Sequence, residues 1–283
     1  MNLTDLSCVR DIMQRHGIAP QKRYGQNFLI NPTVVARIAD TCADREAGVI
    51  EIGPGIGTLT RELSPRFRKV VAIEIDTSLI PVLGETLGDL DNVKVINADA
   101  MKTDLAALVK EEFDGMPVYV CANLPYYITS PIVMSLLESG GIFEAVTVMI
   151  QKEVADRFCA VAGSTDYGAI TLAVNYYSEV EKCFNVAPGN FMPPPKVTSS
   201  VIRMNIRKEP PVPVRDSENM FRIIKYAFAC RRKTLVNALC TSSPKCDKEE
   251  VIRTLEKLGY DPNIRGERLA LSDYACISDE LTV

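Results

Sequence analysis

Short apolar runs alternate with longer segments of helical periodicity over the first two-thirds of the chain. Five of these runs are rich in β-branched residues: VIEIG (49–53), KVVAIEID (69–76), NVKVINAD (92–99), PVYVCANL (117–124) and AVTVMIQ (145–151). Continuous apolar runs of this kind are typical of parallel strands that are covered on both faces of a sheet. The segments between them are long enough for crossover helices, and Leu59, Leu63 and Phe67 recur with the spacing of one helix face. The pattern predicts an α/β fold with a doubly wound sheet.

The pattern changes near residue 208. The three prolines of NFMPPPKV exclude a helix interior, and the residues after them, Val197 to Ile206, predict one more strand. The sequence KEPPVPV (208–214) has the composition of a linker. We therefore expect two domains, an α/β domain over residues 1–207 and a smaller, all-helical domain over residues 208–283.

Helical periodicity dominates the chain beyond this linker. Three helices are expected: one through 221–239 behind an N-cap at Asp216 or Ser217, one from Asp247 to near Gly259, and one over 272–281.

Composition narrows the class of protein. The chain has 283 residues, of which 47% are hydrophobic and 24% are charged, as in ordinary globular proteins. No apolar run approaches the roughly 18–20 residues of a membrane span, and the N-terminus lacks the apolar core of a secretion signal. Nine cysteines without CxxC pairs and a single histidine, His16, argue against a zinc site and for the reduced thiols of a cytoplasmic protein. One histidine also leaves little scope for histidine-based acid–base catalysis.

The distribution of charge changes the picture given by the net charge. A net charge of −4 argues by itself against binding to nucleic acid. However, acid-free stretches run from Arg15 to Arg37, from Lys182 to Lys208 and from Arg222 to Lys245, with four, five and six Lys or Arg residues. Such stretches predict a local positive face, the alternative being chance clustering on a solvated surface.

The sequence EIGPGIGTLT (51–60) follows a predicted strand and opens a predicted helix. Its three glycines, the first of which is Gly53, allow a tight turn and a close approach of a ligand to the backbone. Glu74 ends the next strand, where a carboxylate accepts both hydroxyls of an adenosine ribose, and Asp99 ends the third, within reach of an adenine amino group. NAD enzymes carry a similar loop, although Glu51 weakens that interpretation. The remaining alternative is a tight turn with two incidental acids.

The segment ANLPYYITSP (122–131) points to chemistry on an adenine amine. That nitrogen is a poor nucleophile because its lone pair is delocalised into the ring, and hydrogen-bond acceptors turn the lone pair towards a methyl donor. Asn123 has a side-chain carbonyl for this purpose, and Pro125 holds Leu124 extended with its own carbonyl free. Tyr126 offers a face on which a flipped-out base stacks. The alternative is a strand–turn–helix junction with a buried tyrosine.

In this order, the motifs resemble those of the ribosomal RNA adenine N6-dimethyltransferases of the small-subunit, kasugamycin-resistance type. RYGQNFLIN (23–31), QKEVADRF, YGAI, NFMPPPKVTSSVIRM and FACRRKTLVNAL resemble further segments of that family, so that the resemblance covers nearly the whole chain. It implies a Rossmann-like fold and an S-adenosylmethionine cofactor bound by Asn27, Leu29, Gly53, Glu74, Asp99 and Asn123. For Asn27 and Leu29 the residues alone indicate only a segment ahead of a helix.

The resemblance also implies a substrate: two adjacent adenosines in the 3′-terminal hairpin of small-subunit (16S) rRNA, each dimethylated at N6 within an assembling 30S particle. Phe191 resembles a second aromatic that stacks on the flipped base opposite Tyr126; alternatively it is a core residue. The residues expected to hold RNA are Lys196, Arg222, Lys225, Arg231, Arg232 and Lys233. For Arg231 to Lys233 the alternative is a role in seating one domain on the other. We expect a cytoplasmic monomer with no metal and no membrane association.

Three other functions remain open from the sequence. A macrolide-resistance methyltransferase of large-subunit rRNA shares the cofactor motifs but more typically shows NIPYNIS where this chain has NLPYYIT. An assembly checkpoint or transcription factor on the same fold would bind RNA or DNA with catalysis secondary. An NAD-dependent oxidoreductase is supported only by the glycine loop.

Overall fold

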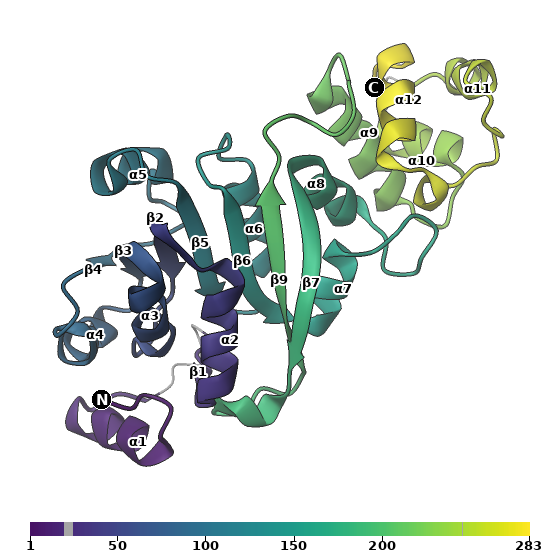
Figure 1. The fold of residues 1–283 in the computed structure, drawn as a ribbon. Coiled ribbons are helices and arrows are strands. Elements are labelled where there is room, and N and C mark those ends of the chain that lie inside the picture. Colours follow the sequence, from purple (N-terminus) through teal and green to yellow (C-terminus); the bar gives the residue numbers. More distant parts are fainter. Residues whose placement is uncertain (20–24, 245) are drawn as a thin grey trace. The chain divides into compact units, whose positions relative to one another are not determined.

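The computed structural model describes residues 1–19, 25–244 and 246–283 (Figure 1). The chain forms two compact units. The first comprises Met1–Ala155 and Glu179–Ile206, and the second comprises Asp156–Ser178 and Arg207–Val283. The expected division into domains over residues 1–207 and 208–283 stays a prediction. The second compact unit begins close to that boundary, but it also contains the earlier segment Asp156–Ser178.

A seven-stranded sheet forms the centre of the first unit, in the order β4-β3-β2-β5-β6-β9-β7. The first five strands in this order, β4, β3, β2, β5 and β6, are parallel to one another, and β9 is antiparallel to β6. Their bounds are β2 Asp44–Ile52, β3 Phe67–Glu74, β4 Val93–Asn97, β5 Val118–Asn123, β6 Ala145–Gln151, β7 Ser178–Val186 and β9 Ser199–Ile206. The chain builds outwards from β2 in one direction and then from β5 in the other, which confirms the predicted doubly wound α/β fold.

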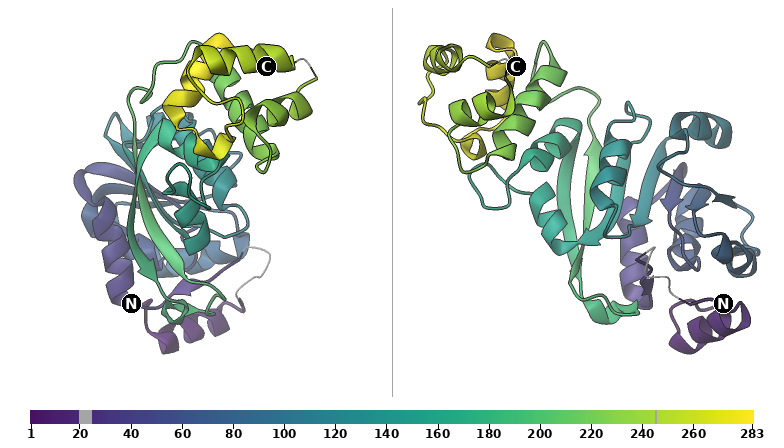
Figure 2. Two further views of the ribbon diagram at one scale, coloured as in Figure 1. Left: turned by 90° about the vertical axis from the view of Figure 1, so that its right-hand side faces the viewer. Right: turned by 180° about the vertical axis from the view of Figure 1, so that it is seen from behind.

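Helices cover both faces of this sheet (Figure 2). On one face, α2 (Pro32–Cys42) and α3 (Thr58–Leu63) bury Val35 and Leu59 in one cluster with Val49 of β2. On the other face, α5 (Leu105–Phe113) places its Phe113 ring over Gly48, the preceding residue of β2. Successive strand residues point to opposite faces, which explains this division. The unit also contains α4 (Ile80–Leu87), α6 (Thr129–Leu137) and most of α7 (Lys152–Phe158).

The helix face predicted from Leu59, Leu63 and Phe67 is wrong at Phe67. Leu59 and Leu63 belong to α3, but Phe67 begins β3. Pro65 lies in a short 3-10 turn, Ser64–Arg66, that separates the two elements. Proline ends the α-helical hydrogen bonding there, so the apolar spacing continues across a change of structure.

The N-terminal helix α1 (Leu6–Arg15) packs beside the glycine loop. Its Val9 and Ile12 share a buried cluster with Phe28, Ile56 and other residues. At its end, Glu85 of α4 accepts hydrogen bonds from Arg15 (2.8 Å) and contacts the His16 ring at 2.7 Å. The hydrogen bonds from these two side chains, Arg15 first, lower the pKa of Glu85 to about 2.

The second unit is helical and has its own core, in which the Tyr274 ring is fully buried. Its helices are α8 Ala169–Tyr177, α9 Ser217–Ala229, α10 Leu235–Ser242, α11 Lys248–Lys257 and α12 Leu271–Glu280. Asp216 is the N-cap of α9 and accepts from the Asn219 amide at 2.9 Å, which decides between the two expected caps. The helices expected after Asp247 and over 272–281 are confirmed as α11 and α12.

The single helix expected through 221–239 is wrong, because two helices, α9 and α10, occupy this range. Cys230 leaves the helical conformation at φ −121° and ψ 49°, and Thr234 becomes the N-cap of α10. The Leu235 amide donates to the Ile264 carbonyl at 2.7 Å, a tertiary hydrogen bond that the pattern of apolar residues does not reveal. Within the described ranges, no helix combines the length and the apolar character needed to span a membrane.

Candidate active site

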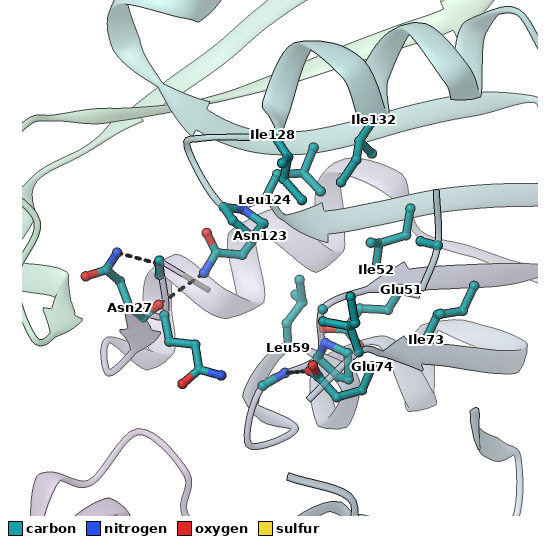
Figure 3. Close-up of a pocket in the computed structure, with 18 of the residues that line it drawn as sticks. Asn27, Glu51, Ile52, Leu59, Ile73, Glu74, Asn123, Leu124, Ile128 and Ile132 are labelled. Atoms are coloured by element: carbon teal, nitrogen blue, oxygen red, sulfur yellow. Dashed lines mark hydrogen bonds between the residues drawn. The ribbon is translucent and has the colours of Figure 1, made fainter. Parts of the chain in front are cut away.

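A cavity opens at the carboxyl ends of β2, β3 and β5, where the direction of chain building changes (Figure 3). Open doubly wound sheets bind ligands at this position. The cavity has an empty volume of about 1080 Å³, including space open to solvent. Its lining includes the predicted residues Asn27, Leu29, Gly53, Glu74, Asp99, Asn123, Leu124, Pro125 and Tyr126. The structure therefore brings together the ends of β2, β3, β4 and β5 and the N-terminal segment 25–29.

The glycine loop has the backbone that its residues predict. Gly53, Gly55 and Gly57 all have positive φ, at 71°, 60° and 89°. At Gly57 a Cβ atom would also lie 2.9 Å from Leu87 Cδ2. At Gly53, in contrast, a Cβ atom would meet nothing within 4 Å, so the loop leaves open space beside the backbone. A ligand can approach the main chain closely at this point.

Glu74 is the best-fixed acid of the cavity, with only 4% of its surface exposed. Its two carboxylate oxygens accept from the Gly55 amide at 3.2 Å and from the Asp76 amide at 2.8 Å. Burial raises its pKa, and these hydrogen bonds oppose the rise. Asp99 is less enclosed, and its Oδ1 accepts from the Met101 amide at 3.0 Å. Two carboxylates at adjacent strand ends can accept hydrogen bonds from ribose hydroxyls and from an adenine amine.

Asn123 ends β5 and faces the cavity (Figure 3). Its Nδ2 donates to the Asn27 carbonyl at 3.2 Å, and the Asn27 side chain in turn donates to the Gly25 carbonyl at 2.9 Å. The Leu124 amide donates to Met149 of β6 at 3.1 Å. Because the Asn123 amide nitrogen is engaged with the N-terminal segment, its amide oxygen is left to accept a hydrogen bond from a ligand.

The Tyr126 ring lines the same cavity, and its hydroxyl group bonds with Ser199 Oγ of β9 at 2.8 Å. Burial raises the pKa of this phenol. The hydroxyl is thus held by the sheet, while the ring contributes a flat wall to the cavity.

Glu51 is a site residue that the sequence did not identify. Its side chain lines the cavity, is 1% exposed and has one oxygen, Oε2, without a hydrogen-bond partner in the described structure. Burial raises its pKa to about 8, and the nearby Glu74 adds to the rise. The signal in the sequence was a lone acid inside an otherwise apolar strand, which is costly to bury without a purpose or a partner.

Gln26 was also missed. Its Nε2 donates to Asp76 Oδ2 at 3.0 Å and so ties the N-terminal segment to the loop after β3. Nothing in the spacing of these two residues, which lie far apart in the sequence, predicted the contact. Arg23 and Tyr24, which belong to the motif RYGQNFLIN, lie outside the described residues.

Phe191 does not line the cavity. It lies in the two-residue strand β8 (Phe191–Met192), pairs with Leu29 of β1 (Phe28–Leu29), and is 3% exposed within the cluster beneath α2. This position does not support the expected role of Phe191 in stacking on the target base, and that role stays a prediction. Lys196 lies nearby in the sequence and is exposed.

The predicted RNA-binding residues of the second unit fall into two groups. Arg231 donates to Glu267 at 2.8 Å and to the Ser164 carbonyl at 3.2 Å, and Arg222 donates to the Val283 carbonyl at 3.2 Å. These two guanidinium groups have structural partners inside the helical unit.

Lys225, Arg232 and Lys233 are exposed, and the last contacts the Thr241 hydroxyl at 3.1 Å. Exposed cations of this kind are available to phosphate groups, so we treat Lys225 and Arg232 as the stronger candidates.

Residues 19–274 match the family model described as ribosomal RNA adenine dimethylase. Two proteins named ribosomal RNA small subunit methyltransferase A are similar over nearly their full length. That of Geobacillus thermodenitrificans is 46% identical, with 96% of this chain and 94% of that protein covered. That of Streptococcus thermophilus is 45% identical, with 99% of this chain and 98% of that protein covered.

Two solved structures are also similar. A dimethyladenosine transferase from Plasmodium falciparum has a TM-score of 0.73 at 26% identity, covering 88% of this chain and 95% of that one. The 23S rRNA methyltransferase ErmE has a TM-score of 0.68 at 29% identity, covering 90% of this chain and 99% of that one.

The sheet order, the glycine loop and the acids at the strand ends define a Rossmann-like, S-adenosylmethionine-dependent methyltransferase. The lining is suited to that cofactor, because the open backbone at Gly53 and the fixed carboxylate of Glu74 provide space and acceptors for an adenosyl group. The chain belongs to the ribosomal RNA adenine dimethylase family. The predicted family and the predicted enzyme class are thereby confirmed.

Proposed function

We propose that this protein dimethylates N6 of two adjacent adenosines in the 3′-terminal hairpin of small-subunit rRNA. The observation that carries the proposal is the Asn123 side chain, which lines the cavity and whose amide nitrogen donates to the Asn27 carbonyl, so that its amide oxygen is left as the acceptor for a ligand. The small-subunit substrate is supported by the relatives of that name, which are 44–46% identical over at least 96% of this chain.

S-adenosylmethionine, when bound, supplies an electrophilic methyl group. Asn27, Leu29, Gly53, Glu74, Asp99 and Asn123 are the residues proposed to hold it. Glu74 is suited to accept from the ribose hydroxyls because both of its oxygens are already aimed by backbone amides. The backbone of the glycine loop admits the cofactor without a clash at Gly53.

The acceptor base is held and oriented by the tip of β5. Asn123 Oδ1 and the Leu124 carbonyl accept hydrogen bonds from the adenine amino group, which directs its lone pair towards the methyl donor. No described residue donates to the Leu124 carbonyl, so this acceptor is available. The Tyr126 ring stacks on the extruded base. Once methylated, the amine carries positive charge and loses its proton readily, so no general base is required.

Two transfers to each adenosine place a further demand on the pocket, which must accept an amine that already bears one methyl group. The wall near the acceptor is apolar where Leu124, Pro125 and Tyr126 line it, and an apolar wall admits a methyl group without burying an unpaired polar atom. Phe191 does not line this wall, because it is 3% exposed within the cluster beneath α2.

The substrate is proposed to be a pre-30S particle in the cytoplasm, bound by a monomer. The exposed cations Lys196, Lys225, Arg232 and Lys233 are proposed to contact phosphate groups, which makes affinity fall with salt. Arg222 and Arg231 contribute less, because both already bond within the helical unit.

The experiment that tests the proposal uses purified protein, labelled S-adenosylmethionine, and small-subunit and large-subunit particles that lack adenine dimethylation. Mass spectrometry of the rRNA should locate two neighbouring dimethyladenosines in the small subunit and none in the large subunit. Label in large-subunit rRNA alone, or in neither, overturns the proposed substrate.

A second candidate function follows from the similarity to ErmE, whose name specifies 23S rRNA. The same assay decides it, since methyl groups would then appear in large-subunit particles. The variant Asn123→Ala distinguishes a purely binding role from a catalytic one. If small-subunit maturation survives the loss of methyl transfer in this variant, the role of the protein in maturation does not depend on catalysis.

A further inference from the structure

Two consecutive tyrosines at the tip of β5 have opposite environments. The Tyr126 hydroxyl is tied to Ser199, and its ring is partly buried. Tyr127 is 59% exposed, the second-highest value among the large hydrophobic side chains of the described chain, yet its side chain also lines the cavity. The exposed ring therefore stands at the rim of the site, one residue from the ring proposed to face the target base.

The backbone under Tyr127 is well fixed. The Ile128 amide donates to the Pro125 carbonyl at 3.3 Å, and the Thr129 hydroxyl donates to the same carbonyl at 3.1 Å. Gly25, at φ 58°, lies against the turn, where a Cβ atom would be 3.6 Å from Pro125 and 3.7 Å from the Tyr127 ring. A bulky ring on a hydrogen-bonded turn is held in place without being covered.

We propose that Tyr127 is a second nucleobase subsite, which stacks on the unpaired base next to the adenosine in the pocket. The inference rests on the proposed function and concerns how the same site recognises its RNA. Adjacent nucleotides then meet adjacent aromatic residues, with one base inside the cavity and its neighbour on the rim.

The chemistry of base extrusion supports this assignment. Moving a base out of its stack leaves its neighbour with an uncovered face, and this unstacking opposes binding. An exposed aromatic ring restores the stacking, and such contacts are tolerant of sequence because every base has a π-face. Tyr127 has the position and the exposure for this role, whereas Phe191 is 3% exposed and does not line the cavity.

The alternative is that Tyr127 only shields the cofactor cavity from solvent. In that case its removal weakens binding of S-adenosylmethionine, while the identity of the neighbouring nucleotide has no effect. The two roles therefore predict different readouts.

The test compares the wild type with Tyr127→Ala and the matched control Tyr127→Phe, which keeps the ring. The substrates are small-subunit particles reconstituted with rRNA whose 3′ segment is synthetic, either intact or with one nucleotide flanking the target adenosine made abasic. Methyl transfer under single-turnover conditions gives kcat/KM, and equilibrium dialysis gives the Kd for S-adenosylmethionine.

On intact particles we expect Tyr127→Ala to lower kcat/KM about tenfold and Tyr127→Phe to stay within about twofold of the wild type. The abasic substitution should lower the rate of the wild type but have little further effect on Tyr127→Ala, and the Kd of the cofactor should be unchanged. Equal rates for Tyr127→Ala and the wild type overturn the inference, as does an abasic effect of the same size in both. An inactive wild type on intact particles refutes the proposed function instead.

Discussion

We expect Glu51 to make the stability of the first unit fall as pH rises, the direction opposite to that of a carboxylate whose pKa is lowered by folding. Its pKa is raised by burial from 4.5 to about 8. Between these values the folded state binds a proton that the unfolded state has released, so stability falls as pH rises. We expect Glu51→Gln, which keeps the shape and cannot ionise, to remove this dependence.

The magnitude follows from the width of the window. A pH of 7 lies roughly 2.5 units above 4.5, the ordinary pKa of a glutamate side chain. Each unit between this pKa and the pH lowers the free energy of unfolding by about 1.4 kcal/mol. The wild type should therefore be about 3 kcal/mol less stable at pH 7 than at pH 4, through this group alone. Glu51→Gln should be more stable than the wild type by about that amount at pH 7, and the difference should vanish near pH 4.

Urea unfolding followed by circular dichroism, at intervals from pH 4 to pH 8, measures this difference. Glu74 also has a pKa raised by burial, so Glu51→Gln should retain part of the pH dependence. The comparison between the two proteins isolates the contribution of Glu51. Parallel stability profiles for the wild type and Glu51→Gln across the whole range would refute the reasoning.

Three further predictions concern catalysis, packing and RNA binding. Asn123→Ala should lower kcat/KM for methyl transfer at least about a hundredfold, because it removes the acceptor that we propose orients the reacting amine; scintillation counting of labelled rRNA measures it. Gly48→Ala should lower the thermal midpoint by an amount equivalent to about 1–3 kcal/mol, since its Cβ would lie 2.1 Å from a ring atom of Phe113. Lys225→Glu with Arg232→Glu should weaken particle binding and reduce the salt dependence by about one log–log slope unit for each phosphate that the protein no longer neutralises.

Matched controls keep these predictions specific. Gly189→Ala, where a Cβ atom meets nothing within 4 Å, should leave the thermal midpoint unchanged. Lys225→Arg should retain the salt slope. Asn123→Ala should unfold at the wild-type midpoint; if it does not, loss of activity reports a folding defect and the catalytic argument is withdrawn. An unchanged salt slope in the charge-reversed protein would mean that these cations do not contact phosphate.

The core of the fold was predictable because its strands are buried on both faces. Residues such as Val49 and Val120 form continuous apolar runs that have no other plausible structure. The strand β7 was missed for the opposite reason: SEVEKCFNV has many polar side chains and is only partly buried. The two-residue strands β1 and β8 carry no periodicity at all, and only tertiary pairing makes them strands.

The candidate site was predictable to the extent that it is made from strand ends. Gly53, Glu74, Asp99 and Asn123 each follow or end an apolar run, and parallel strands bring such ends together. The contribution of Asn27 was not predictable from the residues, because it depends on the pairing of β1 with β8.

The break between α9 and α10 could not be predicted from the sequence either, because it also depends on tertiary contacts. Arg231 and its neighbours are good helix formers by themselves, so the local sequence favours a continuous helix. Hydrogen bonds from Arg231 to Glu267 and Ser164 bind the turn to parts of the chain that no local pattern connects to it.

The pairing of Leu29 with Phe191 also has a consequence for synthesis of the chain. Residues 25–29 leave the ribosome early, but the strand that holds them in place emerges only after more than half of the protein has been made. We therefore expect the wall that contains Asn27 to form late, after the central parallel strands are available. Consequently, we expect a nascent chain arrested before residue 192 to have little capacity to retain the methyl donor, even though most of the residues proposed to contact it have already been translated.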